Sequence, residues 1–537
     1  MTASGWNFAE VWESIADQIP DAPAQRFDGQ MWTWREFDQR ADAIASFLLA
    51  TGASEQDKVA QYLYNSPHYM ESVFAAFKAG LAVVNTNYRY TADELVYLWD
   101  NADVVAVVFH GTFTEQCESV RARLPHITTW LWVDDGSGPR PDWAVDYEGI
   151  VAAPQPSRAV PPWGRSGDHL LLLYTGGTTG MPKGVMWRQD DLYRALIASG
   201  RGDITPDADG RNVVTVNQPG PLNLPGAPLM HGTGLFNAMI VLSAGGSVIT
   251  MPGRRFDPVE LLDTIEHERV KSVTIVGDAF AKPILRALDA EPARWDVSSL
   301  RVIFSSGVMW SRESKEGLLR HNARLILSDA LGSSEAIGMA SSTVTSGGSA
   351  ESATFALAPG TRVIDDSGRD VIPGSDDRGM VAMSGAMPLG YYKDPEKSAA
   401  TFRIIDGIRY TIPGDFATVD ADGTVRLLGR GSQCINTGGE KVYPEEVEEA
   451  LKLHPDVLDA AVVGVPDDRF GEAITALVES APGATVDEAG LIAHVKGRLA
   501  AYKAPKRVIV VPTVNRAANG KLDYKSLKSL AVAAVAD

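Results

Sequence analysis

The segment from residue 174 to residue 184 carries the residues best suited to chemistry. It is Tyr-Thr-Gly-Gly-Thr-Thr-Gly-Met-Pro-Lys-Gly, and it follows an apolar run at residues 170–173. Its glycines let the backbone turn tightly and direct several N–H groups to one point. Threonine hydroxyls and a lysine ammonium add further donors, and this donor set suits a polyphosphate. The residues predicted to bind it are Thr175, Gly176, Gly177, Thr178, Thr179, Gly180 and Lys183.

A glycine-rich surface turn is the simpler interpretation of this segment. It would suffice for an isolated pair of glycines. Three glycines, three threonines and a lysine directly after an apolar strand favour a binding loop. The loop has neither the Gly-Lys followed by Ser or Thr of the P-loop nor a Gly-x-Gly-x-x-Gly that opens a helix. We therefore expect a different kind of phosphate-binding loop.

Strands that alternate with helices are expected to position this loop. Short apolar runs typical of buried strands occur at residues 58–64, 81–84, 103–109, 246–251, 272–276, 301–305 and 325–328. Helical patterns lie between several of them, for example at residues 67–80 and from Asp257 onward. This alternation predicts an α/β fold with layered, mostly parallel sheets. After about residue 355, short strands separated by Gly, Pro and Asp predict a small, mainly β subdomain.

A glycine-rich stretch at residues 429–432 is the candidate linker between two domains. Beyond it, Pro444 and the acidic residues after it fit the first turn of a helix in a compact α/β unit. We expect a large N-terminal domain, residues 1–430, and a small, mobile α/β C-terminal domain, residues 431–537.

Composition limits the classes of function. The chain has 537 residues, which is too long for one ordinary core, and its formal net charge is −19. That charge argues against nucleic acid and anionic membranes as partners. Two cysteines cannot make a disulfide framework, and no apolar run is long enough to span a membrane. With no secretory signal expected, the predicted compartment is the cytoplasm, and a homodimer is left open.

Motifs along nearly the whole chain resemble those of the adenylate-forming superfamily, which includes acyl-CoA synthetases, nonribosomal adenylation domains and firefly luciferase. The loop is similar to the family's Tyr-Thr-Ser-Gly-Thr-Thr-Gly-x-Pro-Lys-Gly, with Gly176 in place of serine. Leu331 replaces an aromatic residue that usually packs on adenine, and Pro413 replaces a threonine. Other matching motifs begin, in the family's order, at Pro228, Ser305, Leu331, Pro413, Gly429, Gly438, Pro444, Tyr502 and Asn519.

The resemblance implies that a carboxylic acid attacks ATP to form an acyl-adenylate, and that coenzyme A then takes the acyl group. Lys521 would stabilise charge at the α-phosphate, and Glu335 would hold Mg²⁺. Asp415 and Arg430 would bind the ribose. The remaining residues implied at ATP are Gly307, Asp329, Leu331, Gly332, Ser333 and Ser334. Those implied at the acyl group are His231, Gly234, Gly277, Ser306, Gly307, Gly332 and Gly338, and those at CoA are Gly438, Gly439 and Lys441.

Simpler roles exist for some of these side chains. Glu335 could be an acid at a helix N-terminus, stabilised by the helix dipole. His231 is interpreted as a wall of the pocket rather than as a catalyst. A lysine near the end of a chain is usually a solvated surface charge, and Lys521 is singled out by its Asn-Gly-Lys context.

An acyl-CoA ligase is the favoured function. The alternatives are an enzyme that adenylates an acid and loads a carrier protein, a ligase for an aryl or short-chain acid, and a silent binding protein. Residues 235–239 offer no aspartate to hold the ammonium of an amino acid, so the acid site is predicted to be apolar and roomy. The variant loop and residues 85–89 and 186–189 resemble those of actinobacterial fatty-acid and steroid side-chain CoA ligases.

Overall fold

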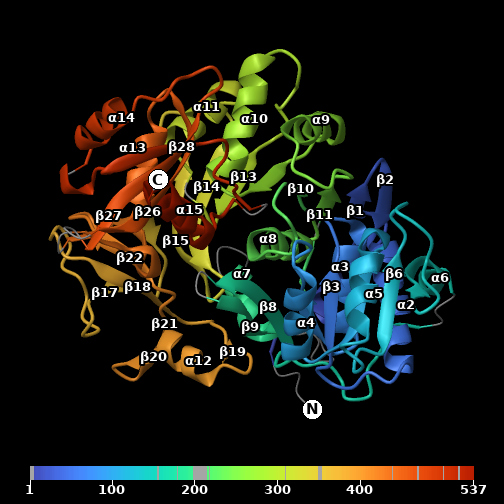
Figure 1. Cartoon of the computed structure of the whole chain (residues 1–537). Coiled ribbons are helices and arrows are strands. Elements are labelled where there is room, and N and C mark those ends of the chain that lie inside the picture. The colour runs from blue at the N-terminus through green and yellow to red at the C-terminus, as the bar shows by residue number, and fades with distance from the viewer. Residues whose placement is uncertain are drawn as a thin grey trace.

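A computed structural model describes residues 5–153, 157–177, 180–197, 214–216, 218–308, 310–348, 353–437, 440–467, 471–499, 501–517 and 520–536. Within these residues three sheets organise the chain, and helices cover them (Figure 1). The two larger sheets belong to the N-terminal part, and the third lies in the C-terminal part. This α/β arrangement confirms the predicted fold class.

The first sheet carries the glycine-rich segment. Its order is β19-β9-β8-β4-β3-β5-β6-β7, parallel from β8 to β7 and antiparallel in the β8–β9 hairpin and at β19. Its strands are β3 (Lys58–Tyr62), β4 (Ala82–Asn85), β5 (Val104–His110), β6 (Thr129–Val133), β7 (Val145–Asp146), β8 (Leu170–Gly177), β9 (Gly180–Arg188) and β19 (Gly390–Tyr391).

The second sheet has 15 strands and contains all the other strands described in the N-terminal part. Strands β11, β10, β12, β13 and β14 are parallel neighbours, and the strands after β14 are antiparallel. The parallel half includes β1 (Pro23–Phe27), β10 (Leu222–Pro225), β11 (Ser247–Thr250), β12 (Ser272–Ile275), β13 (Val302–Ser306) and β14 (Ile326–Ser333), with β2 (Gln30–Thr33) at its edge.

The antiparallel half of this sheet corresponds to the predicted β subdomain. It begins with β15, a little earlier in the chain than residue 355. Its strands are β15 (Ala336–Val344), β16 (Thr354–Leu357), β17 (Thr361–Ile364), β18 (Gly379–Ser384), β20 (Phe402–Ile405), β21 (Ile408–Thr411), β22 (Asp415–Val419) and β23 (Val425–Arg430).

Local sequence explains where the N-terminal helices begin and end. Thr91 caps α4 by a reciprocal pair of bonds with Glu94, and Pro67 opens α3, which is followed by Gly80 at φ +67°. The helices are α1 (Phe8–Gln18), α2 (Trp34–Ala50), α3 (Pro67–Lys78), α4 (Ala92–Asn101), α5 (Thr114–Arg121), α6 (Tyr147–Val151), α7 (Gln189–Ile197), α8 (Gly232–Leu242), α9 (Pro258–Glu268), α10 (Asp278–Ala290), α11 (Arg312–His321) and α12 (Pro395–Thr401), with a 3₁₀ turn η1 (Gly111–Phe113).

The C-terminal part forms its own sheet around its own apolar core. A short 3₁₀ turn, η2 (Gly431–Gln433), separates it from β23, at the place expected for the linker. Its elements are β24 (Ile435–Thr437), β25 (Glu440–Val442), α13 (Pro444–Lys452), β26 (Val457–Asp467), β27 (Gly471–Ser480), α14 (Glu488–Lys496), η3 (Ala501–Lys503), β28 (Arg507–Val511) and α15 (Tyr524–Ala536). No helix among the described residues combines the length and apolarity needed to cross a bilayer.

Candidate active site

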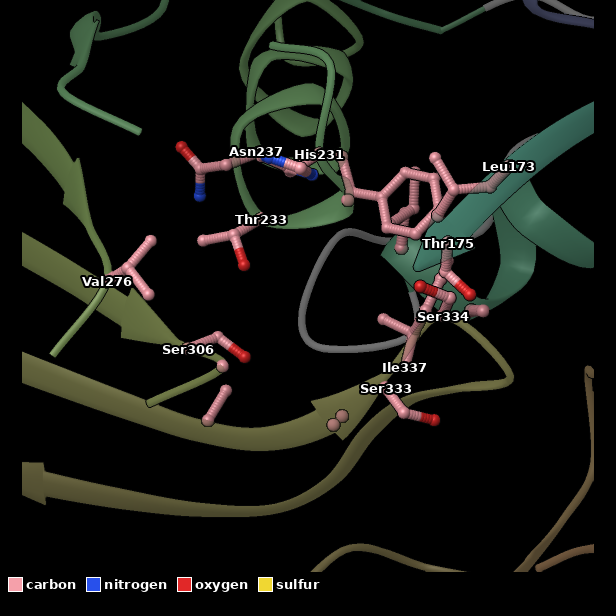
Figure 2. A pocket seen from close by; sticks show the side chains of 18 of the residues that line it. Leu173, Thr175, His231, Thr233, Asn237, Val276, Ser306, Ser333, Ser334 and Ile337 are labelled. Atoms are coloured by element: carbon pink, nitrogen blue, oxygen red, sulfur yellow. The ribbon is translucent and has the colours of Figure 1, made fainter. Parts of the chain in front are cut away.

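A cavity of about 1970 Å³ opens between the two N-terminal sheets and the C-terminal part. Its walls come from β8, the first turns of α8, the ends of β13 and β14, the start of β15, and Ala517 with residues 521–525. Figure 2 shows side chains from these N-terminal elements directed into a common space, with Thr175 and Ser334 on one side and Thr233 and Ser306 on the other. The carboxyl ends of parallel strands are the usual place for a ligand site in such a fold.

Nine predicted site residues line this cavity together. They come from both N-terminal sheets and from the C-terminal part, which sequence order alone could not bring together. They are Thr175, His231, Ser306, Gly307, Gly332, Ser333, Ser334, Gly338 and Lys521.

Asn85 fixes β8 against the segment that leads into α8. Its side-chain amide donates to the carbonyls of Tyr174, at 2.9 Å, and Met230, at 2.7 Å. Its carbonyl oxygen accepts from the Tyr174 N–H at 2.6 Å. Because Asn85 is 3% exposed and satisfied on both sides, it holds Thr175 and His231 on facing walls of the cavity.

Lys521 reaches the cavity on a tightly held turn. The guanidinium of Arg516 donates to both carboxylate oxygens of Asp459 and, at 2.9 Å, to the Gly520 carbonyl. Gly520 has φ +72°, and a Cβ there would lie 2.9 Å from the Cβ of Ala279, so only glycine lets the turn approach α10 this closely. The C-terminal part thereby presents an ammonium to the N-terminal site.

His231 is electrically neutral at pH 7. Removal from water, with the cations Lys521 and Arg89 acting in the same direction, lowers its pKa to about 3. A neutral imidazole suits the pocket wall expected from the sequence.

Glu335 lies in the tight turn between β14 and β15, so the alternative of a helix N-terminus is wrong. It accepts a hydrogen bond from the Tyr391 hydroxyl at 2.7 Å. A single carboxylate fits Mg²⁺, which keeps several waters and uses one or two carboxylates with substrate phosphates. No cluster of three or more His, Cys, Asp or Glu suited to a metal occurs among the described residues.

Comparison with known proteins identifies the family. The family model described as AMP-binding enzyme matches residues 12–392, and the one described as AMP-binding enzyme C-terminal domain matches residues 446–521. The chain belongs to the AMP-binding enzyme family. This confirms the predicted membership of the adenylate-forming superfamily.

Two relatives that are 39% identical to this chain come from Mycolicibacterium smegmatis and Rhodococcus rhodochrous. A medium/long-chain-fatty-acid–CoA/3-oxocholest-4-en-26-oate–CoA ligase from Mycolicibacterium smegmatis is 39% identical, over 98% of this chain and 96% of that protein. A 3-oxocholest-4-en-26-oate–CoA ligase from Rhodococcus rhodochrous is 39% identical, over 97% and 95%. ATP-bound MatB from Rhodopseudomonas palustris is 28% identical, with a TM-score of 0.80 over 98% of this chain and 99% of that one. The predicted likeness to fatty-acid and steroid side-chain ligases is therefore confirmed.

Several predicted residues of this AMP-binding enzyme do not line the cavity. Asp329 forms a buried ion pair with Lys315 at 3.0 Å, and burial raises the pKa of its carboxyl to about 6. Leu331 packs in the core of the β subdomain, and Asp415 faces Arg430 across β22 and β23. The others outside the cavity lining are Lys183, Gly234, Gly277 and Glu335.

Two of these glycines have packing reasons of their own. A Cβ at Gly234 would lie 2.4 Å from the Pro228 carbonyl oxygen, and Gly277 has φ +50° with its N–H bonded to Ser305 Oγ. Close backbone approach explains both glycines without contact to a ligand.

The remaining predicted residues are described only in part or not at all. Gly177 pairs with Gly180 at the end of the β8–β9 hairpin, next to Gly176 in β8, and Lys441 lies in β25 opposite Asn436. Thr178, Thr179, Gly438 and Gly439 lie outside the described residues.

An apolar arm of the cavity was not found from the sequence. It is formed by lining residues of α7 and α8 together with Trp6, whose ring stacks on Tyr193 with centroids 4.7 Å apart. The helical spacing of α7 predicts a buried face but not that the face meets the N-terminal segment. The arm is lined by Trp6, Tyr193, Leu196, Ile197, Phe236 and Ile240.

A second cavity of about 440 Å³ lies beside the first, between α10 and the C-terminal part. Pro228 and Ala517 line both. Arg255 and Arg286 are exposed there and make no ion pair with any described residue. The cations that line this second cavity include Arg89, Arg255, Lys282, Arg286, Lys452 and Arg516.

Proposed function

We propose that this protein is an acyl-CoA ligase. It joins an apolar carboxylic acid to the AMP moiety of ATP and then transfers the acyl group to coenzyme A. AMP and pyrophosphate are released. The observation that carries the proposal is the lining of the main cavity, which combines polar residues at the strand termini with an apolar arm that includes Trp6. A substrate with a reactive carboxylate and an apolar body fits both ends.

The polar end accounts for the first step. The acid's carboxylate must approach the α-phosphate, and both groups are anionic. Lys521 supplies a cation where that charge accumulates, and the hydroxyls of Thr175, Ser333 and Ser334 supply donors to phosphate oxygens. Glu335 would hold Mg²⁺, which neutralises phosphate charge when bound. No covalent nucleophile is required, because positioning and charge stabilisation lower the barrier.

The apolar arm supports a medium- or long-chain fatty acid or a steroid side-chain carboxylate as substrate. The relatives from Mycolicibacterium smegmatis and Rhodococcus rhodochrous are named for such acids. Asn237, the polar residue of α8 nearest the arm, accepts a hydrogen bond from Thr274 at 2.6 Å. No acidic side chain lines the described part of the arm, so an amino acid's ammonium would lack a partner there.

The second cavity supports CoA as acceptor. A CoA molecule carries a diphosphate and a 3′-phosphate, and Arg255, Lys282 and Arg286 offer cations for them. The pantetheine arm would run from this cavity past Pro228 into the main one, and Gly438, Gly439 and Lys441 would approach it after rotation of residues 431–537 about the linker. Because Lys521 lines the main cavity in the present orientation, this orientation would suit the adenylation step.

A reducing compartment fits the use of ATP and CoA by a chain that has only two cysteines, Cys117 and Cys434. The cytoplasm is therefore our proposed location, and a homodimer stays a prediction.

AMP release with a panel of acids tests the function. We expect turnover that requires free CoA and rises from acetate to octanoate and longer acids, by at most about 0.8 kcal/mol per buried methylene. Equal turnover without CoA would favour an adenylating enzyme that loads a carrier. Faster turnover of acetate or of amino acids would refute the apolar arm as the acid site.

A charge reversal tests the second cavity. Arg286→Glu should raise the KM for CoA at least about tenfold and leave the KM for ATP unchanged. Arg320→Glu, an exposed residue of α11 outside both cavities, is the matched control. Dephospho-CoA, which lacks the 3′-phosphate, shows which phosphate Arg286 contacts. If Arg286 contacts the 3′-phosphate, Arg286→Glu should raise the KM for dephospho-CoA less than the KM for CoA. Equal KM values for CoA in the two variants would contradict this placement.

A further inference from the structure

The short strand β19 and the turn after it contact both charged side chains expected at the triphosphate. β19 pairs with β9, with Gly390 opposite Met186 and Tyr391 opposite Val185. The Tyr391 hydroxyl donates to Glu335 Oε1 at 2.7 Å. Three residues on, Asp394 Oδ2 lies 2.9 Å from Lys183 Nζ. One segment thus links the phosphate-loop lysine to the acid that follows β14.

Tyr391 is fixed before any ligand arrives. It is 6% exposed, its ring packs edge-on against Phe402 at 5.9 Å, and its N–H donates to Ser398 Oγ at 2.8 Å. Asp394 is likewise held, because it accepts from the Lys397 N–H as the N-cap of α12. These contacts leave little freedom for either side chain to follow a moving partner.

A further hydrogen bond connects strand β9 to the turn between β14 and β15, which carries Glu335. The Trp187 indole in β9 donates to the Ser334 carbonyl at 2.9 Å, and Trp187 is fully buried. The turn that carries Glu335 is therefore anchored through its backbone by β9 and through its carboxylate by β19.

We propose that Tyr391 is a positioning residue for Glu335. The hydroxyl engages Oε1 and leaves Oε2 to the cation that accompanies ATP, so the carboxylate need not be ordered when the nucleotide binds. This inference rests on the proposed function, since it assumes that Glu335 meets Mg²⁺·ATP. Residues that orient a metal-binding side chain typically contribute 10- to 100-fold to metal affinity.

Calorimetric titration of ATP at a series of Mg²⁺ concentrations tests the proposal without turnover. Tyr391→Phe should raise the Mg²⁺ concentration for half-maximal ATP binding about tenfold. Binding at saturating Mg²⁺ and the melting temperature of the ligand-free protein should change little. Tyr392→Phe is the matched control, because the neighbouring hydroxyl bonds instead to Asp103 at 2.7 Å and should leave the Mg²⁺ dependence as in wild type.

Two outcomes would overturn the proposal. One is a Tyr391→Phe protein with the wild-type Mg²⁺ dependence, and the other is an equal shift in Tyr391→Phe and Tyr392→Phe. In a double-mutant cycle, Tyr391→Phe should add little once Glu335→Gln is present, and additive effects would also refute it. A wild-type protein that binds no ATP at any Mg²⁺ concentration would instead refute the proposed function itself.

Discussion

Lys521 offers the sharpest test, because the C-terminal part brings its charge to a site built by the N-terminal part. Lys521→Ala removes an exposed side chain, so folding should be little affected. Acyl-adenylate formation should suffer because an attacking carboxylate and the α-phosphate concentrate negative charge where the ammonium lies. Thioester formation from supplied acyl-AMP should suffer far less, since that charge has left with pyrophosphate.

The magnitude follows from Coulomb's law. A full charge pair at about 4 Å with an effective dielectric of about 20 is worth about 4 kcal/mol. Part of that attraction already acts on ground-state ATP and cannot speed the reaction. A differential of about 2.7 kcal/mol remains reasonable, equal to a loss of roughly 10² in adenylation rate.

Two measurements check this effect. Pyrophosphate release in the first turnover gives the adenylation rate, and Lys525→Ala, at another lysine that lines the cavity, is the control. Imidazole NMR gives a readout without turnover: the pKa of His231 should rise from about 3 in Lys521→Ala, because Lys521 helps to lower it, and should stay below its usual range because burial and Arg89 remain. Equal losses in both half-reactions, or an unmoved His231 pKa, would refute the reasoning.

Three further predictions concern stability, pH and specificity. Lys78 has no exposed surface and lies 2.7 to 2.8 Å from three carboxylates, so Lys78→Ala should lower the free energy of unfolding by about 3–5 kcal/mol, against under about 1 kcal/mol for Arg35→Ala in an exposed pair, both by denaturant titration. Because the His231 pKa is lower in the folded than in the unfolded chain, the unfolded chain takes up the proton first, so stability should fall as the pH drops from about 6.5 toward 3, and His231→Gln should flatten that fall. Trp6→Ala should shift kcat/KM toward longer acids relative to octanoate by about tenfold, since it lengthens the apolar arm.

Each of these has a contrary result. Equal destabilisation by Lys78→Ala and Arg35→Ala would mean that the buried cation is not the essential partner of its carboxylates. An unchanged pH dependence in His231→Gln would assign the acid sensitivity to other groups. A uniform loss over all acids in Trp6→Ala would show damage to the fold rather than a longer arm.

Local signals in the sequence predicted many of the strands. Valine-rich runs such as residues 104–110 are buried on both sides of a parallel sheet, and the loop's glycines are spaced for a hairpin end. Contacts between distant segments were beyond such signals. Tyr391 and Glu335 are 56 positions apart, and nothing in either neighbourhood marks the other. A glycine in a motif can also be required for more than one structural reason. Gly234 was expected beside the acid, and the structure shows that a Cβ there would clash with the Pro228 carbonyl oxygen.

The acidic charge of the protein has to be reconciled with the proposed binding of ATP and CoA. A chain with a net charge of −19 should repel ATP and CoA at long range. Charges on the surface are screened beyond about 8 Å at physiological ionic strength, so binding depends on groups close to the ligand. Lys521, Arg255 and Arg286 line the cavities, whereas Lys78 forms ion pairs with buried carboxylates. Under the proposed function, the placement of a few cations, rather than their total number, would let this acidic protein hold two polyanions.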